Sequence, residues 1–465
     1  MSEQAIRGAT DPGAALAAYA ASVAFERLPG EVVSVLKRML LDTLGTTLAG
    51  SALGTGCAEL LAVVREAGGT AESTLIGFDA RVPAAQAALA NGATGHALNY
   101  EDVYPGGGHL GVVTIPAALA LAERQGGVSG REFLAALAAG AEIAARLQVA
   151  VRRRDDGTSE AKPQPTQMLG YFSAAASAGR VLGLGPDAML SALGLALMQA
   201  SGNRQVVVEG PPAKAIYASF PNQGGVLSAL LSAKGLRADC AIFAGEAGFF
   251  PTFYQGRYDP APLTERLGEE YYLAQVGFKP WPTTNRAHPF IEAALELAAS
   301  HPLDAIAEVH VVGGNHIRTF CEPLATRQRP HTSVEAEDSI FFGVAKALVN
   351  RQVTLADFQP DGLRQPETVA LGPRMRYSLD AALGHAGIVE VTTAAGERYR
   401  CRIDKPLGDP AKPLSDAQLV AKFRDCARHA VTPLAPPTLD AVIALVEHLE
   451  DAPDVAALTA LLRGG

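Results

Sequence analysis

Residues 33–50 read VSVLKRMLLDTLGTTLAG, and the spacing of the apolar side chains in this stretch decides the fold class. Hydrophobic residues recur every three or four positions, at Val33, Leu36, Leu40, Leu41 and Leu44. This is the period of an amphipathic α-helix. The glycines at positions 45 and 50 predict that the helix ends in this region. The stretch therefore indicates a helix that buries one face against other elements.

The same period recurs through the first half of the chain. It predicts further helices over residues 115–122, 133–149, 173–182, 187–199 and 226–233. Turns that contain glycine or proline separate most of them, for example Gly183-Leu184-Gly185. With 48% hydrophobic residues and one Trp, the core must come mostly from Ala, Leu, Val and Ile, which suits closely packed helices. We expect a layer of many short helices here.

A different pattern begins after Tyr271, where β-branched residues form runs. The runs predict strands over residues 307–312, 374–379, 387–393 and 398–403. The last two flank Ala394-Ala395-Gly396-Glu397, which is typical of a hairpin turn. Helical periodicity persists over residues 291–299 and 340–349, and residues 415–418 have the spacing of a capping box. We expect a mainly α chain: an all-helical domain of residues 1–270 plus 405–465, and a smaller α+β domain of residues 271–404.

Composition argues against several classes of protein. The 39 Lys and Arg against 48 Asp and Glu give a net charge of −9, which is unlike a nucleic-acid binder. The most apolar charge-free run, residues 188–200, is shorter than the roughly 18 residues that span a membrane. Residues 1–13 lack the apolar core of a signal peptide. The five cysteines form no CxxC pair, so we expect a reduced, cytoplasmic protein without disulfides, a zinc site or a membrane partner.

Residues 96–109, HALNYEDVYPGGGH, form the densest polar stretch. A glycine run brings backbone N–H groups close to an anion, and a histidine titrates near neutral pH. The stretch suits proton transfer on an acidic substrate, and a flexible loop with an ordinary surface histidine is an equally good interpretation. Its histidines and carboxylates lack the spacing of a zincin-type site, so we expect no metal here.

Two further segments carry candidate binding residues. Lys214 lies in GPPAKAIY, where its ammonium either binds a substrate carboxylate or reaches past apolar neighbours to water. The segment FKPWPTTNRAH at residues 278–288 carries Lys279 and Arg286 at the expected domain junction. It would suit a polycarboxylate, or it is a structured linker. The chain has no GxGxxG, Walker A or GxSxG motif, so no nucleotide cofactor is implied.

Taken in order, these stretches resemble the MmgE/PrpD family, which includes 2-methylcitrate dehydratase, cis-aconitate decarboxylase and iminodisuccinate epimerase. The resemblance covers nearly the whole chain and is carried by LDTLG at 41–45, ANG at 90–92, HAL at 96–98, FKP at 278–280, EA at 335–336 and KPLGDP at 405–410. It implies a large helical domain, a smaller α+β domain and a homodimer. It also implies a site between the domains without a metal or an organic cofactor.

Carried over by position, the family's catalytic histidine corresponds to His109, and its two site lysines correspond to Lys214 and Lys279. Four positions depart from the decarboxylase-like pattern. They are Asn99 in place of Asp, Val103 in place of Thr, Gln164 in place of His, and Phe342 in place of Tyr. Each departure removes a charge, a proton donor or a hydroxyl group.

The resulting hypothesis is a cofactor-independent lyase, either a dehydratase or a decarboxylase, that acts on a small di- or tricarboxylate. His109 would move a proton next to a carboxylate while Lys214 and Lys279 stabilise negative charge. Four further residues are candidates for substrate binding: Asn99, Asp102, Gln164 and Arg286. The alternatives are an epimerase or isomerase of a dicarboxylate such as iminodisuccinate, and a non-catalytic carboxylate-binding homologue.

Overall fold

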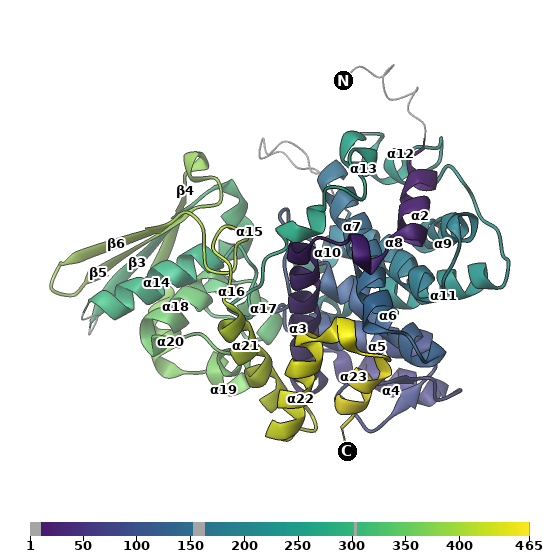
Figure 1. Cartoon of the computed structure of the whole chain (residues 1–465). Helices are drawn as coiled ribbons and strands as arrows, with labels where there is room; N and C mark the ends of the chain where they lie inside the picture. The colour runs from purple at the N-terminus through teal and green to yellow at the C-terminus, as the bar shows by residue number, and fades with distance from the viewer. Residues whose placement is uncertain (1–10, 152–162, 302–304, 465) are drawn as a thin grey trace.

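The computed structural model describes residues 11–151, 163–301 and 305–464, and the described elements form a large helical part beside a smaller part with a sheet (Figure 1). This confirms the mainly α fold class with a smaller α+β part that the sequence predicts. The first ten residues, for which the sequence indicates no apolar leader, lie outside the described ranges.

The helical part is built from helices that pack closely on one another. Its main elements are α2 (Gly13–Ser22), α3 (Gly30–Leu53), α4 (Cys57–Ala67), α5 (Ala84–His96), α6 (Gly111–Gln125), α7 (Gly130–Val151), α8 (Pro165–Val181), α9 (Pro186–Gln199) and α11 (Ser219–Ala233). The five helices predicted after residue 100 are all present, and most extend further than predicted. Their ends carry polar, glycine and proline residues, which hide the apolar period.

The glycines of α3 lie inside the helix, so the predicted end at residues 45–50 is wrong. The helix continues to Leu53, and at both glycines it lies close to a neighbouring helix. A Cβ atom on Gly50 would lie 1.9 Å from the carbonyl oxygen of Thr94 on α5, and one on Gly45 would lie 3.3 Å from the Cα of Phe423. These glycines let neighbouring helices approach closely, which the sequence pattern alone does not distinguish from a helix end.

The last sixty residues return to the helical part. They form α21 (Asp416–Arg428), α22 (Pro436–Glu447) and α23 (Ala456–Leu461), drawn in yellow beside α3 in Figure 1. The predicted capping box is present at the start of α21, between Ser415 and Gln418. Leu419, Val442 and Leu458 of these helices belong to the same hydrophobic core as α3.

The smaller part is built on a four-stranded sheet in the order β4-β3-β5-β6. Its strands are β3 (Ile306–Gly313), β4 (Met375–Leu379), β5 (Gly387–Thr393) and β6 (Arg398–Ile403), each within one residue of the prediction. β3 pairs with β4 in parallel, whereas β5 and β6 form the predicted antiparallel hairpin. The helix α14 (His288–Ser300) packs against β5 and β6, and α18 (Ile340–Asn350) packs on α14. A separate hydrophobic core fills this part.

Helix α7 is long and apolar enough to cross a membrane by length and composition, and so is the pair α3 and α4 if its 92° bend is ignored. Helix α7 is not one of the charge-free apolar runs of the sequence, because it contains Glu142 and Arg146. In the structure, 94% of the most apolar window of α7 is buried. Its composition is therefore explained by its place in the core, against α6 and α8.

Candidate active site

The polar loop between α5 and α6 lies against the segment that leads out of the helical part. Val103 and Gly277 exchange backbone hydrogen bonds of 2.9 and 2.8 Å, which places the loop beside Lys279. Gly106 and Gly107 have φ values of +102° and +94°, conformations that favour glycine. The predicted glycine run thus turns the chain back toward His109 at the start of α6.

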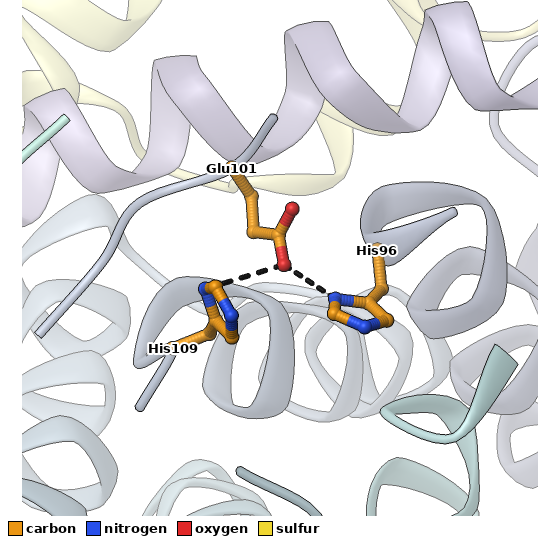
Figure 2. A group of neighbouring side chains, drawn as sticks. All are labelled: His96, Glu101 and His109. Carbon is orange, nitrogen blue, oxygen red and sulfur yellow. Dashed lines mark hydrogen bonds and ion pairs between the residues drawn. The ribbon is translucent and has the colours of Figure 1, made fainter. Parts of the chain in front are cut away.

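His96, Glu101 and His109 form a buried cluster (Figure 2). Both imidazole Nδ1 atoms face the same carboxylate oxygen of Glu101, with His109 at 3.3 Å and His96 in closer hydrogen-bond contact. Burial raises the pKa of Glu101, but the neighbouring His96 and Lys279 outweigh the effect of burial and hold that pKa below its ordinary value. Glu101 is therefore a buried, ionised carboxylate between two histidines.

The hydrogen bonds of His109 define its tautomer. Its Nδ1 lies 2.6 Å from the backbone carbonyl oxygen of Asp102. Because a carbonyl can only accept, Nδ1 carries the hydrogen, and the lone pair of the neutral ring is on Nε2. Burial lowers the pKa of His109 to about 3, against the opposing effect of Glu101. His109 is therefore neutral near pH 7, as a general base must be before it accepts a proton.

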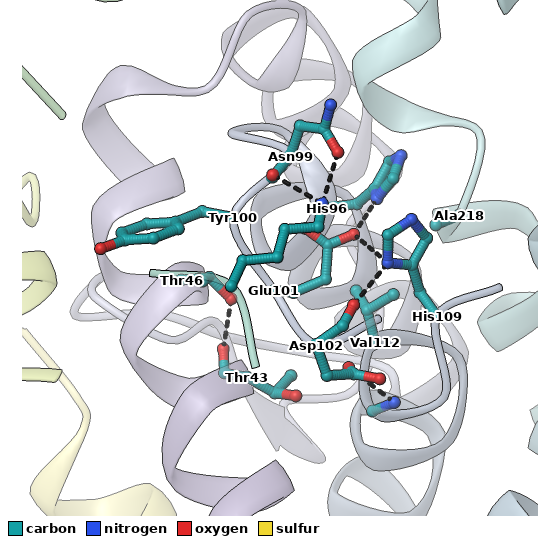
Figure 3. Close-up of polar contacts among 12 residues, drawn as sticks. Thr43, Thr46, His96, Asn99, Tyr100, Glu101, Asp102, His109, Val112 and Ala218 are labelled. Carbon is teal, nitrogen blue, oxygen red and sulfur yellow. Dashed lines mark hydrogen bonds and ion pairs between the residues drawn. The ribbon is translucent and has the colours of Figure 1, made fainter. Parts of the chain in front are cut away.

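Lys279 lies on the other side of the same loop. Its ammonium donates to the backbone oxygen of Asn99 at 2.7 Å and to the side-chain oxygen of Asn99 at 2.6 Å. Figure 3 shows Asn99 in the same loop as Glu101 and His109. Asn99 has φ +49°, a left-handed conformation that asparagine tolerates better than most residues. Burial lowers the pKa of Lys279 to about 8, with Glu101 opposing the shift and Lys422 adding to it. Lys279 is thus a buried lysine that is still mostly protonated, and so positively charged, at pH 7.

A second buried lysine supports this arrangement from α21, the first of the three helices that return to the helical part. Lys422 donates to the carbonyl oxygens of Tyr100 and Lys279 at 2.7 and 2.9 Å, and pairs with Asp42 of α3 at 2.6 Å. Its ammonium also lies 4.0 Å from the centre of the Tyr100 ring. Lys422 therefore joins three segments that are distant in sequence and fixes the backbone on both sides of Lys279.

Lys214 meets the smaller part of the molecule. It lies on the short helix η2 (Pro212–Ile216), and its ammonium is 2.7 Å from a carboxylate oxygen of Asp338. Glu337, which ends α17 (Ser333–Glu337), is buried beside this pair. Burial raises the pKa of Glu337 to about 8. The charge of Lys214 opposes this rise, and the charge of Asp338 adds to it. Lys214 is therefore a paired lysine in a buried acidic setting.

Asp102 has a structural contact for each of its carboxylate oxygens. They accept hydrogen bonds from the backbone N–H groups of Leu110 and Gly111, at 2.9 and 3.0 Å, at the start of α6. Burial raises the pKa of Asp102 to about 7, with Asp42 adding to the shift. Asp102 thus caps the helix that presents His109.

Gln164 lies at the N-terminus of α8, and its side chain hydrogen-bonds the hydroxyl of Tyr217. The Tyr217 ring packs edge-on against His96, with the ring centres 4.4 Å apart. Burial raises the pKa of Tyr217, and the charges of Glu101 and Asp338 add to the shift. Gln164 is therefore linked to the cluster of His96, Glu101 and His109 through Tyr217.

The candidate Arg286 and the departure position Phe342 both have contacts within the smaller part. The guanidinium of Arg286 lies 2.7 Å from the Nδ1 of His385. The Phe342 ring packs in the core of that part, 5.4 Å from the Phe358 ring. The position of the Phe342 ring inside this core explains its apolar character.

By residue type, His96, Glu101 and His109 could hold a metal ion, and their ligand atoms all lie within 4.8 Å of one another. The geometry fits a hydrogen-bonded cluster better. One carboxylate oxygen serves both rings, and the Nδ1 of His109 also donates to the Asp102 carbonyl. A metal ion bound through this Nδ1 would need the nitrogen deprotonated and free of the carbonyl, whereas binding through Nε2 would leave the hydrogen bond to the carbonyl in place.

A small cavity adjoins His109. It has a volume of about 10 Å³ and is lined by Gly108, His109, Gln148 and Thr166 together with apolar residues of α6, α7 and α8. This volume matches one water molecule rather than a polycarboxylate. The cavity is therefore smaller than a polycarboxylate.

Comparisons with known proteins identify the family. Residues 14–261 match the MmgE/PrpD N-terminal domain, and residues 281–454 match the MmgE/PrpD C-terminal domain. The chain belongs to the MmgE/PrpD family. Among MmgE/PrpD relatives, a human cis-aconitate decarboxylase is 26% identical over 94% of this chain and 91% of its own length. A cis-aconitate decarboxylase-like protein of Aspergillus oryzae is 27% identical, with 94% of each chain covered. The cis-aconitate decarboxylase of Aspergillus terreus is 25% identical over 88% of each chain.

Several residues of this candidate site were not singled out from the sequence. They are His96, Glu101, Tyr217, Glu337 and Asp338. His96 and Glu101 lie in the quoted polar stretch, and Tyr217 follows Lys214 by three residues, so local sequence offered a signal for these. Glu337 and Asp338 lie more than a hundred residues from Lys214 in sequence, and only the tertiary fold brings them to it.

Proposed function

We propose that this chain is a lyase that acts on a small di- or tricarboxylate by moving a proton next to a carboxylate, with no metal or organic cofactor. One observation carries the proposal: His109 is a buried, neutral imidazole whose Nδ1 hydrogen is held by a backbone carbonyl. The names of the relatives, cis-aconitate decarboxylases, support a lyase among the reactions of the family.

The proposed reaction begins when Nε2 of His109 takes a proton from the carbon next to a substrate carboxylate. The electron pair moves into that carboxylate as an enolate, which is unstable in water. Lys279, as a cation fixed by Asn99 in a dry site, stabilises this charge without reorganisation. The imidazolium that forms is stabilised by ionised Glu101, 3.3 Å from its Nδ1.

Two reactions would make the chain a lyase. In a dehydration, the enolate expels a β-hydroxyl group, which leaves as water with the proton that His109 returns. In a decarboxylation, no proton is removed first: the carbon–carbon bond to the leaving carboxylate breaks, CO₂ departs, and the bonding electron pair stays on carbon as a similar carbanion, which then takes a proton from a donor. Glu337 has a pKa of about 8 and is protonated at neutral pH, so it suits this role.

The test is product identification. Purified protein is incubated with cis-aconitate, citrate, 2-methylcitrate, tartrate and iminodisuccinate in separate reactions, followed by proton NMR. We expect an elimination product or CO₂ loss from at least one of them. Epimerisation without elimination would contradict the lyase assignment, and no reaction with any substrate by a folded protein would contradict proton chemistry altogether.

A further inference from the structure

The ion pair between Lys214 and Asp338 joins the two parts of the molecule inside the proposed site. Lys214 comes from the helical part and Asp338 from the smaller part, and their side chains are only 9% and 6% exposed. Among the described residues, Asp338 is the partner of the Lys214 ammonium, at 2.7 Å. A lysine already neutralised in this way attracts a substrate carboxylate weakly.

The other charges near Lys214 do not restore a positive site. Ionised Glu101 lies close enough to Lys279 to influence its pKa, so it offsets the charge of that lysine. Lys422, the next cation, is paired with Asp42. Within the described part of the chain, the cations of the site are thus roughly matched by anions. A tricarboxylate would add three negative charges to this setting.

We propose that Asp338 is a specificity-determining residue that disfavours a third carboxylate, so that the preferred substrate is a small dicarboxylate. A substrate carboxylate placed on Lys214 would also lie beside the Asp338 carboxylate, and two buried like charges repel strongly. Asp338 is instead suited to accept a hydrogen bond from the substrate. This inference rests on the proposed function, because it takes Lys214 and Lys279 as the substrate site.

The test compares two ligands that share a three-carbon chain. Glutarate carries carboxylates on the two ends, and tricarballylate carries a third on the central carbon. Binding of each to the full-length protein is measured by isothermal titration calorimetry at pH 7. We expect the wild-type protein to bind glutarate at least about tenfold more tightly than tricarballylate.

Two variants assign this preference to Asp338. Asp338→Asn keeps the shape of the side chain but leaves the charge of Lys214 without its anionic partner. The ratio of the tricarballylate Kd to the glutarate Kd should therefore fall at least about tenfold. Glu335→Gln is the matched control, since it removes one negative charge from α17, the helix that ends just before Asp338. The Glu335 side chain accepts a hydrogen bond from the backbone of His331 and does not pair with Lys214. The ratio should be unchanged in this control. If Asp338 only stabilised the local structure, Asp338→Asn would weaken the binding of both ligands equally, and the ratio of the two Kd values would not change.

Equal binding of the two ligands by wild type, tighter binding of tricarballylate, or no binding of either would overturn the inference. An unchanged ratio in folded Asp338→Asn would overturn the role of Asp338. If that variant does not fold, the wild-type ratio still decides the substrate class. Neither ligand has to react, so the predicted ratio without turnover of any substrate would sustain this inference while contradicting the proposed lyase.

Discussion

At the scale of single residues, the site combines groups whose ionisation is shifted by burial. His109 is kept neutral, Glu101 is kept ionised, and Lys279 and Glu337 both have a pKa of about 8. The pKa values of Lys279 and Glu337 are shifted toward neutral pH, whereas those of His109 and Glu101 are shifted away from it. Strongly shifted pKa values of this kind are concentrated at functional sites. The histidines, lysines and glycines in the sequence predicted which segments could contribute to the candidate site. The shifts themselves could not be predicted, because they depend on burial and on partners from distant segments.

The activity should fall as the pH rises above about 8. Lys279 is charged below its pKa and neutral above it, whereas Glu337 is neutral below its pKa and negative above it. Both changes weaken the binding of a carboxylate. For one group with a pKa of about 8, kcat/KM should fall about tenfold between pH 7 and 9. A kcat/KM profile measured over this range that stays flat or rises would contradict the assignment.

Turnover should not depend on a divalent metal ion. In the structure, His96, Glu101 and His109 bond to one another and to a backbone carbonyl, an arrangement that needs no ion. Dialysis of the protein against EDTA should leave kcat within about twofold of the untreated value. A large loss of kcat that zinc or another divalent ion restores would show that this cluster is a metal site.

At the scale of elements, the strands and the hairpin were predictable because β-branched runs bounded by turn residues leave few alternatives. The course of α3 was not, since a glycine at a helix crossing and a glycine at a helix end look alike in sequence. Helix α5 was not predicted either, because its run of small residues gives little apolar contrast along its length. The pairing of His96 with Glu101 likewise depends on the path of the loop after α5, which local sequence does not determine.

Gly50→Ala should destabilise the protein. Its new methyl group would collide with the Thr94 carbonyl, which belongs to the backbone of α5 and cannot move alone. Overpacking of this kind costs about 1–3 kcal/mol of unfolding free energy, measured by urea denaturation. Gly30→Ala is the control: it lies at the start of the same helix with open space around the added Cβ atom. Equal stability of the two variants would contradict the close crossing of α3 and α5.

Lys422→Met should lower the free energy of unfolding by more than Gly50→Ala does. It leaves Asp42 buried without its cation and removes the donor to the Lys279 carbonyl, so the expected loss is about 3–5 kcal/mol of unfolding free energy. The matched control is Lys412→Met. Lys412 pairs with Glu292 in a more exposed setting, and its removal should cost less than about 1 kcal/mol. Thermal or urea unfolding measures both, and similar losses would contradict the buried role of Lys422.

At the scale of the whole molecule, the proposed site draws on segments from the entire chain. The loop after α5 supplies His109, the segment before α14 supplies Lys279, and the smaller part supplies Asp338. The returning helix α21 fixes the backbone beneath them through Lys422. Helical periodicity could predict the individual segments but not their assembly. The family resemblance anticipated His109, Lys214 and Lys279 as a group, and the acidic partners of Lys214 came only from the tertiary structure.

The most direct test of the central claim is the rate of solvent deuterium incorporation next to a substrate carboxylate, followed by proton NMR in D₂O. The measurement uses the panel substrate that reacts fastest and compares wild type, His109→Ala and, as a control, the exposed His448→Ala. If His109 moves the proton, its replacement should reduce the rate by about 10²–10⁴ while the fold is retained, and the control should match wild type. A folded His109→Ala variant that exchanges the proton at the wild-type rate would contradict the account.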